Sequence, residues 1–446
     1  MAKKGFLDII KQTQGDGNYP GDEHGGASGS DGRGLPTGKA GNFMFATGIE
    51  CSYPTIEQGK VRRDLLEECG HYKHWRKDLQ LVKDLGLKVL RYGLPYHLVH
   101  QGPGRYDWSF ADEVMKEIKR LKITPIMDLL HFGVPDWLGN FQNPELPIHF
   151  ADYAAAVAER YPWVRYYTPV NEIYVSARIS AKDGVWNEQL KTDEAFVTAI
   201  KHLVAASIMA TQRIAERRPD LVVVQSESAE YTYEARATPS AEVKLLNKLR
   251  FLALDLLYAH PTDSDVCMYL LDNGMTRTEY DWFMAGEPPG YQVMGNDYYG
   301  RNERILLPDG KISQAEDIAG WYQITKEYYQ RYRKPVMHTE TNTFEADKAP
   351  DWLWKQWINI LQMRKDSVPV LGFTWYSLID QVDWDIQLAK KRGQVNECGL
   401  YDLERKPRPV AEAYRQLLQE FGQITIVPRG EMFEISDEPA RLKTEV

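Results

Sequence analysis

The chain has 446 residues, of which 43% are hydrophobic and 12% aromatic, enough to bury a large core. Its net charge of −9 argues against nucleic acid or an anionic membrane surface as the main partner. No apolar run approaches the roughly 18 residues that a membrane-crossing helix needs, so we expect no membrane span. The cysteines form no paired metal-ligand motif, and free thiols in a cytoplasmic protein are the simplest account of Cys51, Cys69, Cys267 and Cys398.

The N-terminal segment is poor in apolar residues. Residues 14–41 read QGDGNYPGDEHGGASGSDGRGLPTGKAG, a composition that offers too little apolar surface to form part of a core. The residues before them contain no sustained apolar segment and no small-residue cleavage site, so we expect no signal peptide. We therefore expect residues 1–42 to form a flexible, Gly-rich arm or lid that the rest of the chain does not need for folding.

Beyond the arm, short apolar runs alternate with segments of helical spacing. The runs that predict strands span residues 43–49, 88–93, 123–130, 164–170, 221–226, 291–297, 334–339 and 369–375. The segments that predict amphipathic helices span residues 75–85, 110–120, 150–160, 194–217, 321–332, 352–363 and 410–421. This alternation predicts parallel strands covered by helices, and eight such units indicate a single (β/α)8 TIM barrel over residues 43–422. Residues 423–446 are expected to form a C-terminal extension with a small strand pair.

Polar and aromatic residues gather at the predicted carboxyl ends of these strands, where barrel enzymes place their chemistry. In chain order they are Glu50, Arg91, His131, Asn171, Glu172, Glu227, Asn296, Tyr298, His338, Glu340 and Trp375. Crowded carboxyl groups cost electrostatic free energy, so a purely structural rim has no reason to collect them. The pattern therefore favours a catalytic site on this face of the barrel.

Two of these acids, Glu172 after the fourth strand and Glu340 after the seventh, suggest the paired-carboxyl chemistry of glycoside cleavage. One acid must stay protonated to give its proton to the leaving oxygen, and the other must stay ionised to attack the sugar carbon. We expect Arg91 to keep Glu340 ionised and the repulsion between the two acids to keep Glu172 protonated. We expect Tyr298 to hydrogen-bond the nucleophile.

Several motifs carry a resemblance to glycoside hydrolase family 1, in order, from about Phe43 to Phe421. The stretch TPVNEIY (168–174) resembles the family's Thr-Phe-Asn-Glu-Pro signature, and HTETN (338–342) resembles its Thr-Glu-Asn-Gly nucleophile motif. Further similar stretches are LLHFGVPDWL (129–138), NDYYG (296–300), SLIDQVDWD (377–385) and CGLYDLERKPRPVAEAYRQLL (398–418).

The resemblance implies a retaining β-glycosidase with Glu172 as acid/base and Glu340 as nucleophile. It also implies a carbohydrate or glycoside as the partner. The residues that it implies for sugar binding are His131, Asn171, Arg91, Asn296, Tyr298, Trp375, Asp383 and Trp384. No metal cluster, nucleotide loop or redox motif is visible in the sequence, so we expect no cofactor and no metal. The sequence indicates no particular oligomeric state.

The chain departs from the family pattern at sugar-contacting positions. The first strand reads GIECSYP, with Glu50 near the position where the family carries a sugar-binding Gln. The family's Glu-Trp pair appears as Asp383-Trp384, and either Trp375 or Tyr376 is expected to be the platform under the sugar. A shorter carboxylate reaches other hydroxyls, so we expect plain β-glucosides not to be the best substrates.

Three other functions remain open at the level of sequence. A transglycosylase would use the same covalent intermediate, with an alcohol, sugar or lipid acceptor in place of water. A non-catalytic carbohydrate-binding barrel is disfavoured because both glutamates are present. A 6-phosphosugar glycosidase is a weaker option, supported only by the lysines of AKKRGQ (389–394).

Overall fold

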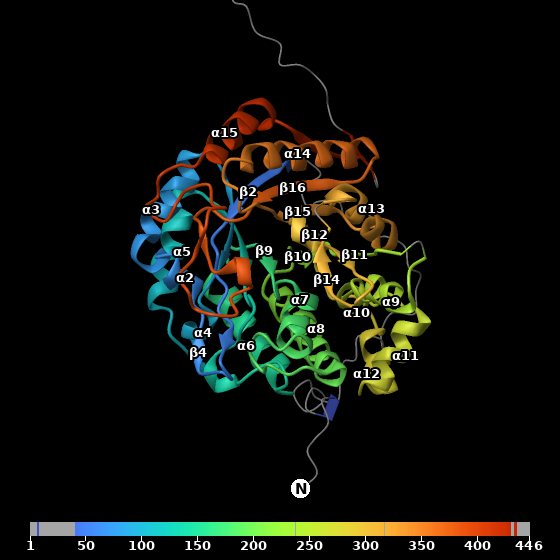
Figure 1. The fold of residues 1–446 in the computed structure, drawn as a ribbon. Helices are drawn as coiled ribbons and strands as arrows, with labels where there is room; N and C mark the ends of the chain where they lie inside the picture. Colours follow the sequence, from blue (N-terminus) through green and yellow to red (C-terminus); the bar gives the residue numbers. More distant parts are fainter. Residues whose placement is uncertain (1–6, 9–40, 237, 316, 430–431, 435–446) are drawn as a thin grey trace, which may run out of the picture.

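The computed structural model describes residues 7–8, 41–236, 238–315, 317–429 and 432–434. Eight parallel strands form a closed barrel at the centre of the molecule (Figure 1). The strands lie side by side in chain order, and the last pairs with the first to close the barrel. They are β2 (Met44–Gly48), β5 (Val89–Gly93), β8 (Thr124–Asp128), β9 (Tyr166–Thr168), β10 (Val222–Ser228), β12 (Tyr291–Asp297), β15 (Val336–Glu340) and β16 (Val370–Trp375). The predicted TIM barrel and its eight strands are confirmed.

Helices surround the barrel, and each helical segment predicted from the sequence is present. Figure 1 shows α3 and α5 on one side of the strands and α13, α14 and α15 on another. Helix α5 shows why these segments pack against the barrel: its buried residues recur at helical spacing and so form one apolar face. They are Ala111, Val114, Met115, Ile118 and Leu121. The covering helices are α3 (His71–Asp84), α5 (Ser109–Leu121), α6 (Leu146–Arg160), α8 (Asp193–Ala215), α13 (Gly320–Tyr332), α14 (Ala349–Lys365) and α15 (Pro409–Phe421).

Helix α8 has the length and composition of a membrane-crossing helix. The sequence reading expected no apolar run of this kind. The most apolar stretch of α8 has a mean hydropathy of 1.2. However, 89% of that stretch is buried inside the fold, where α8 packs against α6. A buried core helix accounts for the same composition, so this helix is weak evidence for a membrane span.

A second, smaller sheet lies beyond the carboxyl ends of β10 and β12, and the sequence reading missed it. It consists of β11 (Tyr231–Glu234), β13 (Glu303–Leu306) and β14 (Ile312–Gln314). Four helices between β11 and β12 were also missed: α9 (Ala241–Leu249), α10 (Leu252–Leu257), α11 (Ser264–Asp272) and α12 (Arg277–Phe283). A local signal existed for α12, because Thr276 and Glu279 form a capping box at its start.

Short elements complete the loops and the termini. The expected C-terminal strand pair is present, since β19 (Thr425–Arg429) pairs antiparallel with β20 (Met432–Glu434) and with β1 (Gly41–Asn42). Nearly all of the expected arm, residues 1–42, lies outside the described residues, as does the tail 435–446. The loop elements are β3 (Thr55–Ile56), β4 (Val61–Arg62), α2 (Leu65–Glu68), α4 (Tyr96–Val99), β6 (His100–Gly102), β7 (Arg105–Tyr106), α7 (Ile173–Ala177), β17 (Gln381–Val382) and β18 (Val395–Asn396).

Candidate active site

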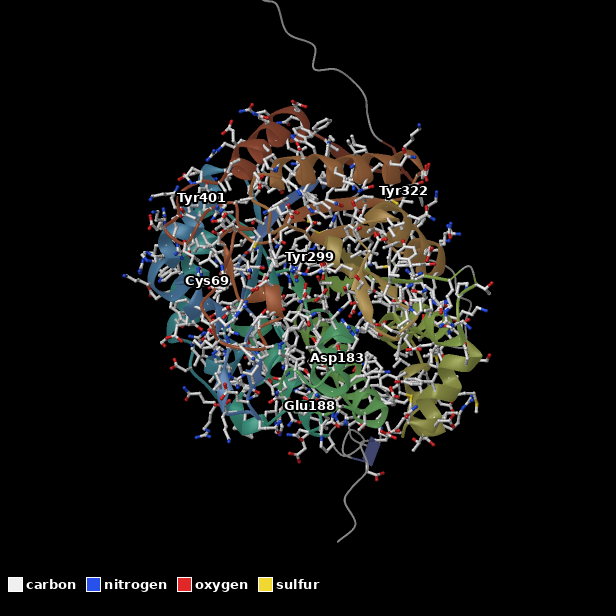
Figure 2. All side chains as sticks on the ribbon, in the orientation of Figure 1. Cys69, Asp183, Glu188, Tyr299, Tyr322 and Tyr401 are labelled. Atoms are coloured by element: carbon white, nitrogen blue, oxygen red, sulfur yellow. The ribbon has the colours of Figure 1, made fainter. Side chains whose placement is uncertain are left out.

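A cavity of about 340 Å³ opens at the carboxyl ends of the barrel strands. Glu172 and Glu340 both line it, so the fold brings together the two acids that the sequence singled out. Tyr299 also lines the cavity, and Figure 2 shows it near the centre of the molecule. The other lining residues used below are Glu50, His131, Arg301, Gln381 and Trp384.

Glu340, at the end of β15, is held by two hydrogen-bond donors. Arg91 from β5 donates through Nη1 to Oε1 at 2.5 Å, and Tyr299 donates through its hydroxyl to Oε2 at 2.7 Å. Arg91 is itself fixed, because Nη2 also donates to Asp128 Oδ2 at 3.0 Å and to Asn171 Oδ1 at 2.9 Å. The carboxylate of Glu340 therefore has a set orientation and a positive charge beside it.

The expectation that Tyr298 hydrogen-bonds Glu340 is wrong, because Tyr299 makes that contact. The hydroxyl of Tyr298 instead lies 2.6 Å from Glu303 Oε1, and its ring stacks on Trp352 with centroids 6.0 Å apart. Side chains alternate along β12 and the residues that follow it, so Tyr299 lies on the same side as Asp297, whereas Tyr298 points away from Glu340. The sequence reading chose the wrong member of this adjacent pair.

Glu172 lies at the junction between β9 and α7 in a left-handed backbone conformation, with φ 40° and ψ 63°. A residue with a Cβ adopts this region at a cost that the surroundings must offset, and such residues cluster at functional sites. Glu227 supports the turn, because its carboxylate accepts from the backbone N–H groups of Ile173 at 2.8 Å and Tyr174 at 3.3 Å. Among the described residues, none donates a hydrogen bond to the Glu172 carboxyl.

The surroundings of Glu172 favour its protonated form. Burial, followed by the nearby carboxyls of Asp297, Glu340 and Glu227, raises its pKa well above the ordinary value. Asp297 is fully buried, and burial together with Glu340 raises its pKa as well. One oxygen of Asp297 accepts from Ser226 Oγ at 2.6 Å, while the other has no partner in the described part of the chain. Asp297 is thus a third acid of this site that the sequence reading did not identify.

His131 and Asn171 form a hydrogen-bonded pair beside the nucleophile candidate. His131 Nδ1 lies 2.8 Å from Asp128 Oδ2, and its Nε2 lies 3.3 Å from Asn171 Nδ2. His131 lines the cavity, as expected for a sugar-binding residue. Asn296 does not line it: its side chain is fully buried, and neither amide atom finds a partner among the residues described.

Trp384 is the tryptophan that faces the cavity. Its side chain lines the cavity, while its indole Nε1 is buried and has no hydrogen-bond partner in the described residues. Trp375, expected as a platform under the sugar, is fully buried, and its Nε1 donates to the carbonyl oxygen of Cys398 at 3.0 Å. Tyr376 is also buried, with its hydroxyl donating to the carbonyl of Ile49 at 3.2 Å. Neither alternative for the platform therefore lines the cavity.

Asp383 does not reach the cavity either, which corrects its expected contact with sugar hydroxyls. Its carboxylate is fully buried and accepts from Arg63 Nη2 at 3.0 Å. It also accepts from the backbone N–H groups of Arg392 at 2.7 Å, Gly393 at 3.0 Å and Gln394 at 2.9 Å. The carboxylate of Asp383 therefore binds the backbone of residues 392–394 and stabilises the loop between Asp383 and these residues. Asp383 itself has a left-handed backbone conformation, with φ 55°.

Glu50 and Gln381 occupy the part of the cavity that Asp383 was expected to serve. Gln381 Nε2 donates to Glu50 Oε2 at 3.0 Å, and the backbone N–H of Ser52 donates to Glu50 Oε1 at 3.0 Å. Burial raises the pKa of Glu50 above its ordinary value. Gln381 was missed, although its position two residues before Asp383, in SLIDQVDWD, offered a signal.

One cluster has the residue types of a metal site. A ligand atom each from Cys51, Asp128 and His131 lies within 4.8 Å of the others. However, Asp128 Oδ2 already accepts from Arg91 at 3.0 Å, and that guanidinium places a positive charge where a cation would bind. This donor set therefore does not favour a metal ion.

Comparisons with known proteins identify the family of the chain. The profile of glycosyl hydrolase family 1 matches residues 26–262. β-Glucosidase A of Thermotoga maritima is 21% identical over 363 residues, covering 73% of this chain and 81% of that protein. An aryl-phospho-β-D-glucosidase of Bacillus subtilis is 23% identical over 420 residues, covering 80% and 87%.

The fold is shared with a solved structure. A β-glucosidase from Thermotoga maritima in complex with castanospermine superimposes with a TM-score of 0.72 and 18% identity, over 85% of this chain and 97% of that one. The family profile covers more than half of the sequence, and the two acids of its barrel line one cavity. The chain is a glycoside hydrolase and belongs to glycosyl hydrolase family 1.

Proposed function

We propose that the protein cleaves a terminal β-linked sugar with retention of configuration, through a covalent glycosyl-enzyme. The observation that carries the proposal is the contrast between the two acids of the cavity. Glu340 accepts hydrogen bonds from Arg91 and Tyr299, whereas Glu172 accepts none from the described residues and has a raised pKa. This is the division between nucleophile and acid that a retaining glycosidase requires.

In the first step, the protonated carboxyl of Glu172 gives its proton to the glycosidic oxygen as the bond from that oxygen to the anomeric carbon breaks. A carboxylate oxygen of Glu340 supplies an electron pair to the anomeric carbon and forms an ester bond to the sugar. Arg91 and Tyr299 hold the attacking carboxylate in place, which lowers the entropic part of the barrier. The leaving group departs as a neutral alcohol, and Glu172 becomes a carboxylate.

In the second step, the Glu172 carboxylate takes a proton from water while the water oxygen attacks the anomeric carbon. The ester bond to Glu340 breaks, and Glu172 is protonated again. Two inversions leave the anomeric configuration unchanged. An alcohol or sugar in place of water gives transglycosylation by the same atoms, and the second cavity beside Tyr299 offers room for such an acceptor.

The sugar itself is proposed to lie against Trp384, with hydroxyls on His131, Glu50 and Gln381. The ring of Trp384 supplies an apolar wall, and His131 and the Glu50–Gln381 pair supply the polar contacts. The identity of this sugar follows from which hydroxyls these groups meet, so a panel of sugars is needed. We also propose the cytoplasm as the location, supported by the free state of Cys51, Cys69, Cys267 and Cys398.

The test is the stereochemistry of the first product. 4-Nitrophenyl β-glycosides of the gluco, galacto, fuco, xylo and glucurono series, together with 6-phosphoglucosides, are screened for release of nitrophenol. The best substrate is then hydrolysed in a proton NMR tube, where we expect the β-anomer to appear before the α-anomer. Added methanol should divert part of the sugar into a methyl β-glycoside if transfer competes with hydrolysis. Initial formation of the α-anomer would contradict the proposal.

A further inference from the structure

A second cavity adjoins the first at the mouth of the barrel. It has a volume of about 630 Å³ and is lined by Gly300, Phe344 and Trp352, among other residues. The two cavities share Tyr299, Arg301, Gln314 and Asp385 as lining residues, so they are continuous around these side chains. Neither Glu172 nor Glu340 lines the second cavity. Since the sugar that is cleaved must lie against both glutamates, a group in the second cavity belongs to the leaving group.

Arg301 lies at the junction of the two cavities without a direct ion-pair partner among the described residues, although the carboxyls of Glu172 and Glu340 act on it from farther away. Its guanidinium carbon is 4.9 Å from the ring centroid of Tyr299 and 4.5 Å from that of Phe344. Within the described residues, no carboxylate forms an ion pair with it and no acceptor takes a hydrogen bond from its side chain. The rings support the guanidinium at fixed positions, while its N–H donors remain available to a ligand.

The other charges around the second cavity are already paired. Lys355 forms an ion pair with Asp317, and Lys348 pairs with Glu345. Asp385 pairs with Arg392 at 2.5 Å. The acid that lines this cavity without an ion pair in the described part of the chain is Asp351, whose side chain is exposed to solvent.

Burial opposes the charge of Arg301, since it lowers the pKa of this guanidinium below its ordinary value. An arginine remains charged in proteins regardless, so the cost of partial desolvation is offset best by an anion that binds there. The two aromatic rings hold the guanidinium in position. A guanidinium is planar, and two of its N–H donors match the two oxygens of a carboxylate.

We propose that the second cavity binds the leaving group of the substrate and that this leaving group carries an acidic group, a carboxylate in the simplest case, which pairs with Arg301. This rests on the proposed glycosidase function and adds a substrate class to it: β-glycosides of acidic alcohols or phenols. Tyr299 links the two parts of the site, because its hydroxyl holds Glu340 while its ring supports Arg301.

The experiment compares two aryl β-glycosides that share the best sugar and differ in the leaving group, 4-carboxyphenol against its neutral isostere 4-carbamoylphenol. We measure the ratio of their kcat/KM values in the wild type and in Arg301→Gln, so that intrinsic differences between the leaving groups cancel. A hydrogen-bonded charge pair predicts that the ratio falls about tenfold or more in Arg301→Gln. Arg301→Lys, which keeps the charge but not the fork, should retain part of the preference.

Lys390→Gln is the matched control, because it removes one exposed positive charge from residues 389–394 outside both cavities. We expect it to change the ratio by less than about twofold. An unchanged ratio in Arg301→Gln would overturn the proposal. A loss confined to a 6-phosphoglycoside with a neutral leaving group would also overturn it, because the anion would then belong to the sugar.

Failure of the glycosidase function is distinguishable from failure of this inference. If none of the glycosides is cleaved, binding of 4-hydroxybenzoate and of 4-hydroxybenzamide is measured by calorimetry on the wild type and Arg301→Gln. The inference predicts tighter binding of the acid in the wild type alone. Equal affinity of the wild type for the acid and the amide would overturn it whether or not the protein is catalytic.

Discussion

The surroundings of Glu172 and Glu340 differ, although the two carboxyls line the same cavity. Their exposures are similar, 7% for Glu172 and 4% for Glu340, so burial does not distinguish them. The donors do: Glu340 has Arg91 and Tyr299, whereas Glu172 has three other carboxyls nearby and no donor among the described residues. The comparison teaches that the roles of two identical side chains are set by what neighbouring strands present to them.

The largest effect that sharpens this comparison is expected for Glu172→Gln. Loss of a general acid should lower kcat/KM by about 10² to 10⁴-fold for leaving groups that need a proton. The loss should be far smaller for a 2,4-dinitrophenyl glycoside, because that leaving group departs as an anion. The measurement is kcat/KM against leaving-group pKa, which should give a steeper slope in the variant. An equal loss across the series would mean that Glu172 is not the acid.

Asp383 is a second carboxylate that accepts hydrogen bonds from several donors, and a variant of it shows whether such donors alone make a carboxylate catalytic. It is held as firmly as Glu340, by Arg63 and three backbone N–H groups, but it lies outside the cavity. Asp383→Asn should therefore lower the free energy of unfolding by about 2 kcal/mol, because hydrogen bonds to a charged acceptor are weakened, while Glu68 still pairs with Arg63. Asp385→Asn is the control, with an expected loss below about 1 kcal/mol for a more exposed pair.

Urea unfolding of the two variants checks this prediction. The sugar preference of Asp383→Asn should follow that of the wild type, since no sugar contact is removed. A change of preferred sugar with no loss of stability would return Asp383 to the sugar-binding role expected from the sequence.

The contact between Tyr299 and Glu340 is tested by a pair of neighbouring variants. Tyr299→Phe removes a hydroxyl that donates to the carboxylate, so kcat should fall roughly tenfold or more. Tyr298→Phe removes a hydroxyl whose partners, Glu303 and Asp317, do not line the cavity that holds Glu340, so kcat should change less than about threefold. Kinetics on one aryl glycoside decide between them. A larger effect from Tyr298→Phe would contradict the assignment of Tyr299 as the donor to Glu340.

The smallest expected effect is a change in pH dependence caused by Asp297. This buried acid is among the groups that raise the pKa of Glu172, after burial itself. The alkaline limb of kcat/KM reports loss of the proton from the acid in the free enzyme. Asp297→Asn removes a carboxyl whose ionisation at alkaline pH opposes that of Glu172, so Glu172 should release its proton more easily and the alkaline limb should move to lower pH. A limb that stays in place or moves to higher pH would show that Asp297 does not act on Glu172.

The sequence predicted the parts of the molecule that depend on local patterns. The eight barrel strands were found because both of their faces are buried, which makes the runs continuously apolar. The same alternation put Glu172 and Glu340 at strand ends, and the closed barrel brings all such ends to one face. The covering helices followed from their spacing, as in α5.

The rest depends on contacts between distant segments. Which of the adjacent Tyr298 and Tyr299 meets Glu340 depends on which face of β12 lies toward the site, and the sequence of β12 alone does not show that. Asp383 is drawn to Arg63, which lies 320 residues away in the sequence. The pairing of β11 with β13 spans a run of helices, so no short-range pattern predicts it, whereas the Pro308-Asp309-Gly310 turn between β13 and β14 was a local signal that the sequence reading missed.

The most direct test of the central claim is to trap the covalent intermediate. A 2-deoxy-2-fluoro β-glycoside of the best sugar, with a dinitrophenolate leaving group, forms the glycosyl-enzyme but slows its hydrolysis. Mass spectrometry of the proteolysed enzyme then locates the sugar. The account predicts that the added mass lies on the peptide that contains Glu340. A label on the peptide of Glu172, Glu227 or Asp297 would contradict the division of roles between the two acids.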